Sequence, residues 1–529
     1  MKFHTFIYVQ SLLAAAIFLS PLAADQTDVL RFSNSDQLHG EFLGIDDEGR
    51  VIWQRKDSPE KMQFSSKDLM SVILSKNQAQ QGAEHSFIRL SNNDIIPGNI
   101  VEMNEKTIKL QSSVVGDREI PREHVREICP QPFGRSILYT GPYSKDGWMV
   151  LDMNQKEAAP ETDTEETPDQ EKEAPEVKKQ PDTWQHHGIT WYRKDGSAAL
   201  ARKDCLSEST MLRFRAKWIG RLNLNLGLHA DFSKPPEKKE NAEAEEKNEN
   251  AARKPVLIRG MFMNQESQPF AALLGNSIVL NIYQNYISVS QSTYNAEGKL
   301  QTQRISQSSS AVQIPESGDA VFEIRSDRRS GLLMLFVDGQ YAAQWEYTVA
   351  DQNKDKADSI SLGNGIAFQA TTNKSPMSIS EMVIAEWNGV RDSAKSFQND
   401  KNDVALLHNG LDRYSGTLAG IKDGIATFKS SIGQLQIPVN ELAEVHFAYK
   451  ADEKALETIS GSIAVAFGPI GKISGKPIRS SQTALSMNHP ILGETNVKFD
   501  RAIMIQYSDE NSILNDFNAN DNQLERMKK

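Results

Sequence analysis

The chain has 529 residues, a formal net charge of −11, and 39% hydrophobic and 24% charged residues. Its length allows several domains, and its composition is that of ordinary folded domains in water. Because binding to phosphate backbones needs clustered lysine and arginine, no nucleic-acid partner is expected for a chain this acidic.

Residues 1–24 read as an export signal. Lys2 supplies an early positive charge, apolar residues dominate from Phe6 to Leu22, and Leu22-Ala23-Ala24 offers a small-residue cleavage site. An uncleaved anchor is the alternative, because the apolar stretch is long. No later segment has about 18 uninterrupted apolar residues, so no other membrane span is expected. The sequence therefore predicts an exported protein, located in the periplasm, in the cell envelope or outside the cell.

Residues 25–76 and 84–130 carry one repeated pattern. Each begins with alternating apolar and polar residues, continues with an Asn- and Asp-rich stretch, and reaches a glycine at the same spacing, Gly40 in the first copy and Gly98 in the second. The alternation predicts short strands, and the Asn, Asp and Gly residues predict turns. Near the end of the second copy, the short segment after Pro121 predicts a single 3₁₀ turn before a last strand.

About five strands in roughly 50 residues predict a small barrel, closed so that few strand edges stay unpaired. Such a unit is marginally stable alone, so the copies are expected to pack in pairs. The Asn-x-Asp-x-x-x-Gly start, at Asn34 and Asn92, and the Ile-Pro…Val-x-x-Ile end resemble the small Sm-like or SH3-like barrels. In true Sm proteins a second motif and basic loops hold RNA, and the sequence has no aromatic–basic cluster of that kind.

Two segments have a composition that cannot form a core. Residues 154–183 are rich in Glu, Asp, Pro and Lys without apolar periodicity, which predicts an acidic, disordered linker. Residues 233–254 have the same composition and predict a disordered insertion inside the block that follows the linker.

The block 184–390 alternates apolar and polar residues in several stretches, which predicts strands at 211–218, 222–228, 277–290 (two strands), 321–325, 332–337, 341–345 and 377–387. Asp338-Gly339 predicts a hairpin turn. Together with Phe322-x-Ile324 and Leu333-x-Leu335-x-Val337, this hairpin resembles the concanavalin-like or laminin-G-like jelly roll. The resemblance implies a β-sandwich. Domains of this shape include sugar-derivative hydrolases and proteins that only bind glycans or proteins, so the fold does not settle function.

The pattern of the first two copies returns after the block. Residues 400–449 reach Gly416 and end on Ile437-Pro438 like the second copy, so a 3₁₀ turn is expected after Pro438 as well. Residues 459–508 follow the pattern more loosely. Residues 509–529 form a polar tail. The expected architecture is all-β, with a central jelly-roll β-sandwich flanked by small β-barrel repeats.

No catalytic, cofactor-binding or metal-binding residue is identified from the sequence. The Glu-x-Asp-x-x-Glu pattern of jelly-roll glycosidases is absent from the blocks expected to fold. Glu323 and Glu381 are the carboxylates that a cleft could combine, although both could instead face solvent. His186 and His187 are neighbours on a strand, so they point to opposite faces, and no zinc-type ligand set accompanies them. Calcium held by scattered oxygen atoms is left open.

The two cysteines and the aromatic residues of the block each allow two interpretations. Cys129 and Cys205 form either a disulfide bond between two domains or two free thiols. Aromatic side chains of 184–390 form either a sugar-stacking platform, which Tyr283 and Tyr286 could join, or core packing. The tryptophans concerned are Trp184, Trp191, Trp218, Trp345 and Trp387.

These observations favour an exported, non-catalytic, multi-domain binding or scaffold protein whose jelly roll binds a glycan or a protein. A glycoside hydrolase-like enzyme acting on a sugar derivative is the first alternative. A structural component of the cell envelope that assembles with itself is the second. The sequence leaves the oligomeric state open.

Overall fold

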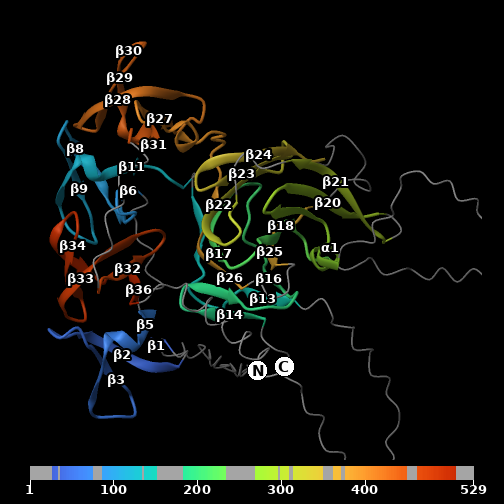
Figure 1. The fold of residues 1–529 in the computed structure, drawn as a ribbon. Coiled ribbons are helices and arrows are strands. Elements are labelled where there is room, and N and C mark those ends of the chain that lie inside the picture. Colours follow the sequence, from blue (N-terminus) through green and yellow to red (C-terminus); the bar gives the residue numbers. More distant parts are fainter. Residues whose placement is uncertain are drawn as a thin grey trace, which may run out of the picture.

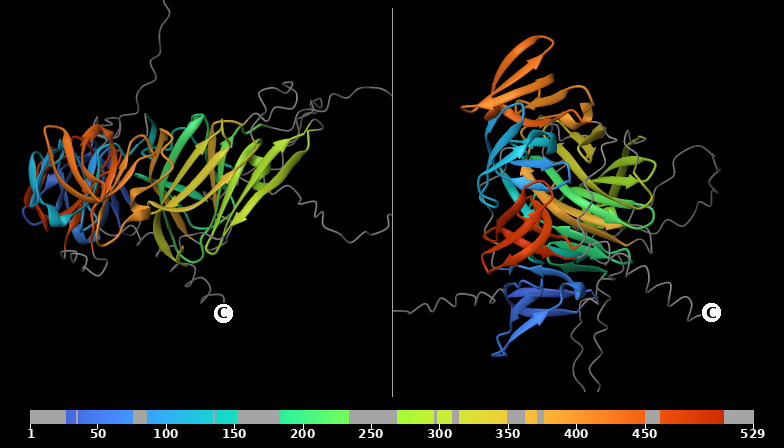
Figure 2. Two further views of the ribbon diagram at one scale, coloured as in Figure 1. Left: turned by 90° about the horizontal axis from the view of Figure 1, so that it is seen from above. Right: turned by 60° about the vertical axis from the view of Figure 1, so that its left-hand side comes forward.

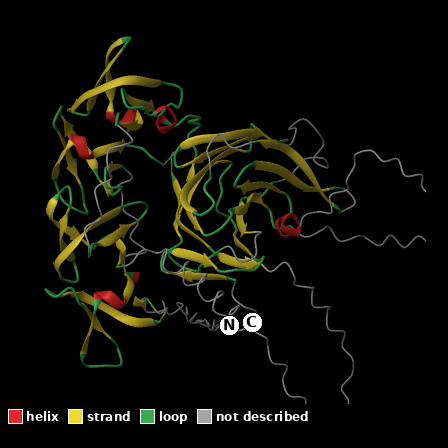
Figure 3. Ribbon diagram, in the orientation of Figure 1, coloured by secondary structure: helices red, strands yellow, loops and turns green. Residues whose placement is uncertain are grey.

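The computed structural model describes residues 27–33, 36–75, 86–133, 136–151, 183–233, 269–295, 298–308, 314–348, 362–370, 376–449 and 461–507. The described elements are almost all strands, which confirms the all-β fold class (Figure 3). No helix in this part of the chain is long and apolar enough to cross a membrane. The export signal, the polar tail, and the linker and insertion except for Thr183 and Ser233 lie outside the described residues.

Two sheets form the central sandwich. The first sheet has the order β14 (Trp184–His187), β15 (Thr190–Arg193), β26 (Met377–Glu386), β17 (Ser209–Trp218), β22 (Gly318–Asp327), β23 (Leu332–Val337) and β24 (Gln340–Glu346), and β12 (Ile137–Gly141) also pairs with β26. The second sheet has the order β13 (Trp148–Leu151), β16 (Ala199–Arg202), β25 (Gly365–Ala370), β18 (Asn223–Ala230), β19 (Ser277–Tyr283), β20 (Ile287–Tyr294) and β21 (Leu300–Ser308). The short helix α1 (Pro269–Leu274) packs on its outer face.

Alternating apolar side chains fill the space between the two sheets. Phe214, Phe322 and Phe368 are fully buried there, and the ring centroids of Phe214 and Phe368 lie 5.1 Å apart. The predicted hairpin is confirmed, since Asp338 and Gly339 both have positive φ between β23 and β24, as a type I′ turn requires.

The sandwich begins earlier in the chain than residue 184. Strands β12 and β13 precede the acidic segment, yet they pair with β26 and β16. The predicted start at 184 is therefore too late. Both strands are short, and their partners lie far away in the sequence, so local periodicity did not assign them to the block.

Four further units surround one continuous apolar core. The first unit contains β1 (Asp28–Phe32), β2 (Gln37–Ile45), β3 (Val51–Gln54), β4 (Lys61–Phe64) and β5 (Leu69–Ile73), and the second contains β6 (Phe87–Leu90), β7 (Ile95–Pro97), β8 (Asn99–Met103), β9 (Thr107–Gln111), β10 (Arg118–Pro121) and β11 (Val125–Cys129). The third contains β27 (Asp403–Leu407), β28 (Arg413–Lys422), β29 (Ile425–Ser430), β30 (Gly433–Pro438) and β31 (Leu442–His446), and the fourth β32 (Ile463–Phe467), β33 (Lys472–Ser480), β34 (Ala484–His489), β35 (Gly493–Lys498) and β36 (Ala502–Gln506).

The strand pairing is the same in all four units: the first strand pairs with the second and with the last. The 3₁₀ turns predicted before the last strand are confirmed at Arg122–His124 and Val439–Glu441. The predicted closure into barrels is wrong. Among the described strands, no pairing register joins the next-to-last strand of a unit to its last strand, since β4, β10, β30 and β35 pair with the strands before them.

The last strand of each unit pairs with the last strand of another unit, and not with the strand before it in its own unit. Strand β11 of the second unit pairs with β31 of the third, and β5 of the first pairs with β36 of the fourth. Single bridges β7–β33 and β8–β28 add contacts between the second unit and the fourth and third. The units therefore stack in the spatial order three, two, four, one, as a column beside the sandwich (Figures 1 and 2). The units do pack against one another, but in one continuous stack and not in separate pairs, because the second unit pairs with both the third and the fourth.

The repeated glycine has a different role from the turn predicted for it. Gly40 lies within β2 and Gly416 within β28. A Cβ atom at these positions would collide with the backbone carbonyl oxygens of Gln54 and Lys429 on the neighbouring strands. Glycine is needed here because two backbones approach each other closely.

Candidate functional site

A cleft of about 530 Å³ lies between the first sheet of the sandwich and the column. Strands β17, β22 and β26 form one wall, and the second, third and fourth units contribute the other. Apolar side chains hold the two walls together at one end, among them Phe87 and Phe133 from the column side, and Met334 and Phe336 from the sheet. The cleft is thus a product of both parts of the molecule.

Alternation along the strands places charges on the sandwich wall. In β17 the side chains of Leu212, Phe214 and Ala216 fill the core, whereas Arg213 and Arg215 line the cleft. The same period in β22 directs Asp319, Glu323 and Arg325 toward the cleft. Because successive side chains of a strand point to opposite faces, the buried apolar positions fix the direction of the charged ones.

Most of these charges are paired. Arg215 lies 2.8 Å from Asp319 and 3.0 Å from Glu381, and Arg325 lies 2.6 Å from Glu323. Burial alone would raise the pKa of Glu381, but the charge and hydrogen bond of Arg215 outweigh it and lower the pKa. Glu381 is therefore ionised at neutral pH.

Arg213 is the exception. It lies opposite Glu323 in the β17–β22 register, yet it forms neither a hydrogen bond nor an ion pair with any described residue. Burial lowers the pKa of Arg213, and Glu323 and Glu381 attract it only at longer range. The five N–H groups of its guanidinium are therefore available to a partner outside the described residues.

A β-bulge aims Glu381 into the cleft. The register between β17 and β26 shifts by one residue between Arg213 and Arg215, so β26 carries an extra residue there. Glu381 has a φ of 46°, a left-handed conformation that is uncommon for a residue other than glycine. Bulges with such conformations cluster beside functional sites, where they redirect a side chain.

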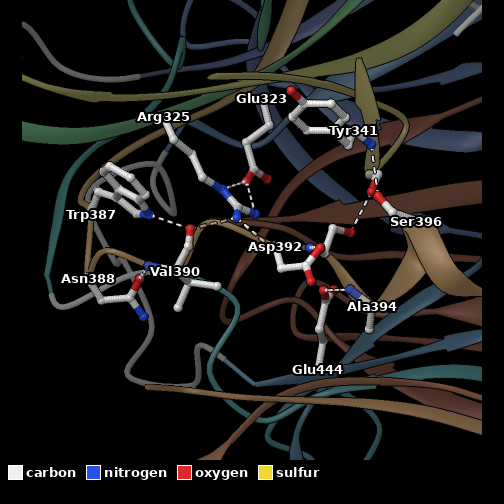
Figure 4. Close-up of polar contacts among 12 residues, drawn as sticks. Glu323, Arg325, Tyr341, Trp387, Asn388, Val390, Asp392, Ala394, Ser396 and Glu444 are labelled. Carbon is white, nitrogen blue, oxygen red and sulfur yellow. Dashed lines mark hydrogen bonds and ion pairs between the residues drawn. The ribbon is translucent and has the colours of Figure 1, made fainter. Parts of the chain in front are cut away.

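The segment 388–397 contributes to the lining of the cleft and is held from both sides (Figure 4). From the sandwich, Arg325 donates hydrogen bonds to the backbone carbonyls of Val390 (2.8 Å) and Asp392 (2.7 Å). From the third unit, Glu444 accepts a hydrogen bond of 2.5 Å from the backbone N–H of Ala394. These contacts fix the relative position of the two walls.

The column wall carries a group of three potential metal ligands in the β11–β31 pairing, here called the seam, and His446 lies beside two of them. Glu127, Cys129 and Glu444 have ligand atoms that all lie within 4.8 Å of one another. His446 Nε2 lies 3.3 Å from Glu444 Oε2 and 3.8 Å from Glu127 Oε1. Burial opposes charge on the imidazole, but Glu127 and Glu444 outweigh it and raise the pKa of His446.

The structure places the residues singled out in the sequence as follows. Glu323 and Glu381 both line the cleft. His186 and His187 lie on β14, away from it. Cys129 and Cys205 are both free thiols, so the interpretation without a disulfide holds. All five tryptophans of the block are at most 5% exposed, as expected for core packing.

Tyr283 and Tyr286 stack on each other with ring centroids 4.4 Å apart, on the second sheet and far from the cleft wall. The structure thus shows no exposed tryptophan platform within the described residues.

Sequence reasoning missed Arg213 and Arg215, although a signal was present. Basic residues occupy three successive alternate positions, 213, 215 and 217, between buried apolar residues, which marks one charged face of a strand. The seam gave no comparable signal, because Cys129 and His446 lie on strands far apart in the sequence.

No family model matches the sequence, and no curated protein matches it. Among solved structures the chain is similar to a carbohydrate-binding module from Bacillus subtilis, at 8% identity over 45% of this chain and 95% of that one, with a TM-score of 0.23. It is also similar to a Bacillus subtilis protein with a galectin-like fold (10% identity, 48% and 97% covered, TM-score 0.26) and to a galectin from Caenorhabditis elegans (10%, 36% and 94%, TM-score 0.19). Similarity at this level carries no argument about a ligand, which has to come from the side chains of the cleft.

Proposed function

We propose that this protein is an exported binding protein that takes up a saccharide in the cleft between the sandwich and the column. A volume of about 530 Å³ is within the range of small-ligand sites, which is about 300–1,000 Å³. A protein partner would need a surface of about 1,200–2,000 Å², which suits an open face better than a cleft between two walls.

The chemistry of the wall fits hydroxyl groups. A sugar hydroxyl both donates and accepts hydrogen bonds, whereas guanidinium groups only donate and carboxylates only accept. Arg215 beside Glu381 presents donors and acceptors next to each other on rigid strands, and the carboxylate of Glu323 adds a further acceptor on the same wall.

Arg213 carries the proposal. It lies on the same wall as these groups and has no hydrogen bond or ion pair with a described residue. Arg213 is half-buried and lines the cleft, so its donors are available to a ligand that enters there. A saccharide that offers Arg213 a hydroxyl pair or a carboxylate would satisfy these donors.

Calorimetric titration and a glycan array, with neutral and acidic oligosaccharides on the full chain, test this function. Arg213→Met keeps much of the side-chain volume and removes the donors, so binding should weaken at least tenfold, which corresponds to about 1.4 kcal/mol. Arg329→Met is the matched control, because Arg329 is exposed at the β22–β23 turn and does not line the cleft. Equal affinities of Arg213→Met and the wild type, or no retained oligosaccharide at all, would contradict the proposal.

One observation favours an enzyme as the second candidate, namely that two carboxylates, Glu323 and Glu381, face the same cleft. Glycoside hydrolysis needs one ionised and one protonated carboxyl group. Glu381, with its lowered pKa, suits the nucleophile or base. Release of reducing sugar by the wild type but not by Glu381→Gln would support this reading, and no turnover across a broad oligosaccharide panel would remove it.

For the column we propose four copies of one Sm-like or SH3-like unit, which act as a scaffold for the second wall of the cleft. The shared strand pairing and the 3₁₀ turns before β11 and β31 support this assignment. Residues 25–76, 84–130, 400–449 and 459–508 are the proposed copies.

A further inference from the structure

Three side chains of the seam, Glu127, Cys129 and Glu444, place ligand atoms within 4.8 Å of one another, and His446 contacts both carboxylates. Cys129 donates its thiol hydrogen to Glu127 Oε1 at 2.8 Å, and His446 Nε2 lies 3.8 Å from the same oxygen. Glu444 turns its Oε2 toward His446 at 3.3 Å. Ligand bonds of about 2.0–2.3 Å in a tetrahedral zinc site imply ligand separations of roughly 3.3–3.8 Å. The separations of His446 from the two carboxylates match this range, whereas Cys129 lies closer to Glu127, so a bound ion would push the thiol and this carboxylate apart.

Outer contacts hold both carboxylates in this orientation. Arg89 donates to Glu127 Oε2 at 2.7 Å, which leaves Oε1 directed at Cys129 and His446. The backbone N–H of Ala394 donates to Glu444 Oε1, which leaves Oε2 directed at His446 (Figure 4). Metal-ligating carboxylates are typically held by hydrogen bonds of this kind.

The fold itself does not require these four residues. The pairing of β5 with β36 is a second seam of the same construction, in which Val72 faces Ile505 as Ile128 faces Val445. Counted from these central pairs, Ser71 and Ile73 stand in the second seam where Glu127 and Cys129 stand in the first. Met504 and Gln506 likewise stand in the places of Glu444 and His446. Two strands can thus be joined in the same way without a buried charged set.

Burial of charged groups normally destabilises a fold unless they serve a purpose. Cys129 and His446 are at most 4% exposed, and Glu127 only 11%. All four side chains line the cleft, so an ion could reach them from it. These ligand side chains are little exposed, yet they can be reached from the cleft, and the fold accepts neutral residues at the same positions. This combination points to a ligand.

We propose that Glu127, Cys129, Glu444 and His446 bind a divalent transition-metal ion of the Zn²⁺ class. Sulfur and imidazole ligands select against Ca²⁺ and Mg²⁺, which take oxygen ligands. Two carboxylates and a thiolate around a doubly charged ion leave one negative charge, and Arg89 balances it. The thiol proton of Cys129 leaves to solvent on binding, and so does the second ring proton of His446 in molecules where the imidazole is charged. This site is independent of the saccharide function proposed above.

Titration of the metal-free full chain with Zn²⁺ against a chromophoric chelator tests the site. The wild type should bind one ion, and Cys129→Ser and His446→Gln should each weaken binding by about 100-fold or more. Cys205→Ser is the matched control, because Cys205 is a buried free thiol of the sandwich core outside the seam. Co²⁺ should give a thiolate-to-metal absorption band in the wild type and in Cys205→Ser, and none in Cys129→Ser.

A combined variant separates metal binding from folding. Glu127→Ser, Cys129→Ile, Glu444→Met and His446→Gln together copy the second seam, in which Arg31 faces Ser71 as Arg89 faces Glu127. This variant should keep the wild-type circular dichroism and lose Zn²⁺ binding. Stoichiometric Zn²⁺ binding by the combined variant, or no Zn²⁺ binding by the wild type, would overturn the proposal.

Discussion

Arg325 donates a hydrogen bond of 2.8 Å to the backbone carbonyl of Val390, and this contact ties the sandwich to the segment that leads into the third unit (Figure 4). Arg325→Lys keeps the charge but cannot bridge Glu323 and two carbonyls at once. We expect a loss of about 2 kcal/mol in unfolding free energy, typical of hydrogen bonds to a charged group. Hydrogen exchange of the amides in 388–397 should become faster, as mass spectrometry would show. Arg329→Lys, at an exposed site, serves as the control, and unchanged exchange in Arg325→Lys would contradict the clamp.

The positive φ at Glu381 predicts that a glycine variant is more stable than an alanine variant there, the reverse of the order expected in a regular strand. Glu381→Gly and Glu381→Ala both lose the ion pair with Arg215, but only glycine accepts a φ of 46° without strain. The glycine variant should therefore be more stable by about 1 kcal/mol. At Glu323, in a regular strand, the alanine variant should be the more stable one by about 0.5–1 kcal/mol. Urea denaturation of the four variants measures both differences. The same sign at both positions would refute the strained bulge.

The close approach at Gly40 predicts a severe cost for one added methyl group. Gly40→Ala would place its Cβ against the carbonyl oxygen of Gln54, part of a backbone that cannot yield easily. We expect a loss of about 3 kcal/mol. Gly49→Ala meets no atom within 4 Å and has a φ of 78°, so it should cost only about 1 kcal/mol. Chemical denaturation of both variants gives the comparison, and equal losses would show that steric contact is not the reason for glycine at position 40.

The buried imidazole of His229 predicts loss of stability in acid. Burial, with a contribution from Arg328, lowers the pKa of His229 to about 3, from an ordinary 6.5. Between these values the unfolded chain binds a proton that the folded chain does not. The contribution of His229 is therefore complete above pH 6.5 and is lost as the pH falls toward 3. Between pH 7 and pH 4.5 the loss is about 2–3 kcal/mol.

Replacing His229 tests this contribution. His229→Asn tolerates the φ of 53° and does not titrate, so its unfolding free energy should fall less between pH 7 and pH 4.5 than that of the wild type. His39→Asn, at an exposed position of β2, controls for the loss of one histidine. Parallel pH profiles of His229→Asn and the wild type would exclude His229 as the source.

Local patterns were sufficient for much of the fold. Asp338-Gly339 alone located a hairpin, and Pro121 and Pro438 located 3₁₀ turns, because turn chemistry acts over a few residues. The alternation of Leu212 and Phe214 with polar neighbours defined β17 and its buried face.

Relations between distant residues were not accessible from these patterns. Nothing near Ile128 indicates that Val445 faces it, because the pairing depends on edge strands that any unit could offer. The four ligands of the seam and the two walls of the cleft follow from that pairing. The site could therefore be located only from the three-dimensional structure, although the alternating basic residues of β17 in the sequence already indicated one charged face.

The pairing of β36 with β5 has a consequence for biosynthesis. The first unit emerges from the ribosome before the fourth, yet β36 of the fourth unit covers the edge of the first unit at β5. Until the fourth unit has been synthesised, this edge can pair with foreign strands, and a chaperone or delayed folding has to protect it. A premature stop after the third unit would thus leave β5 of the first unit without its partner strand β36.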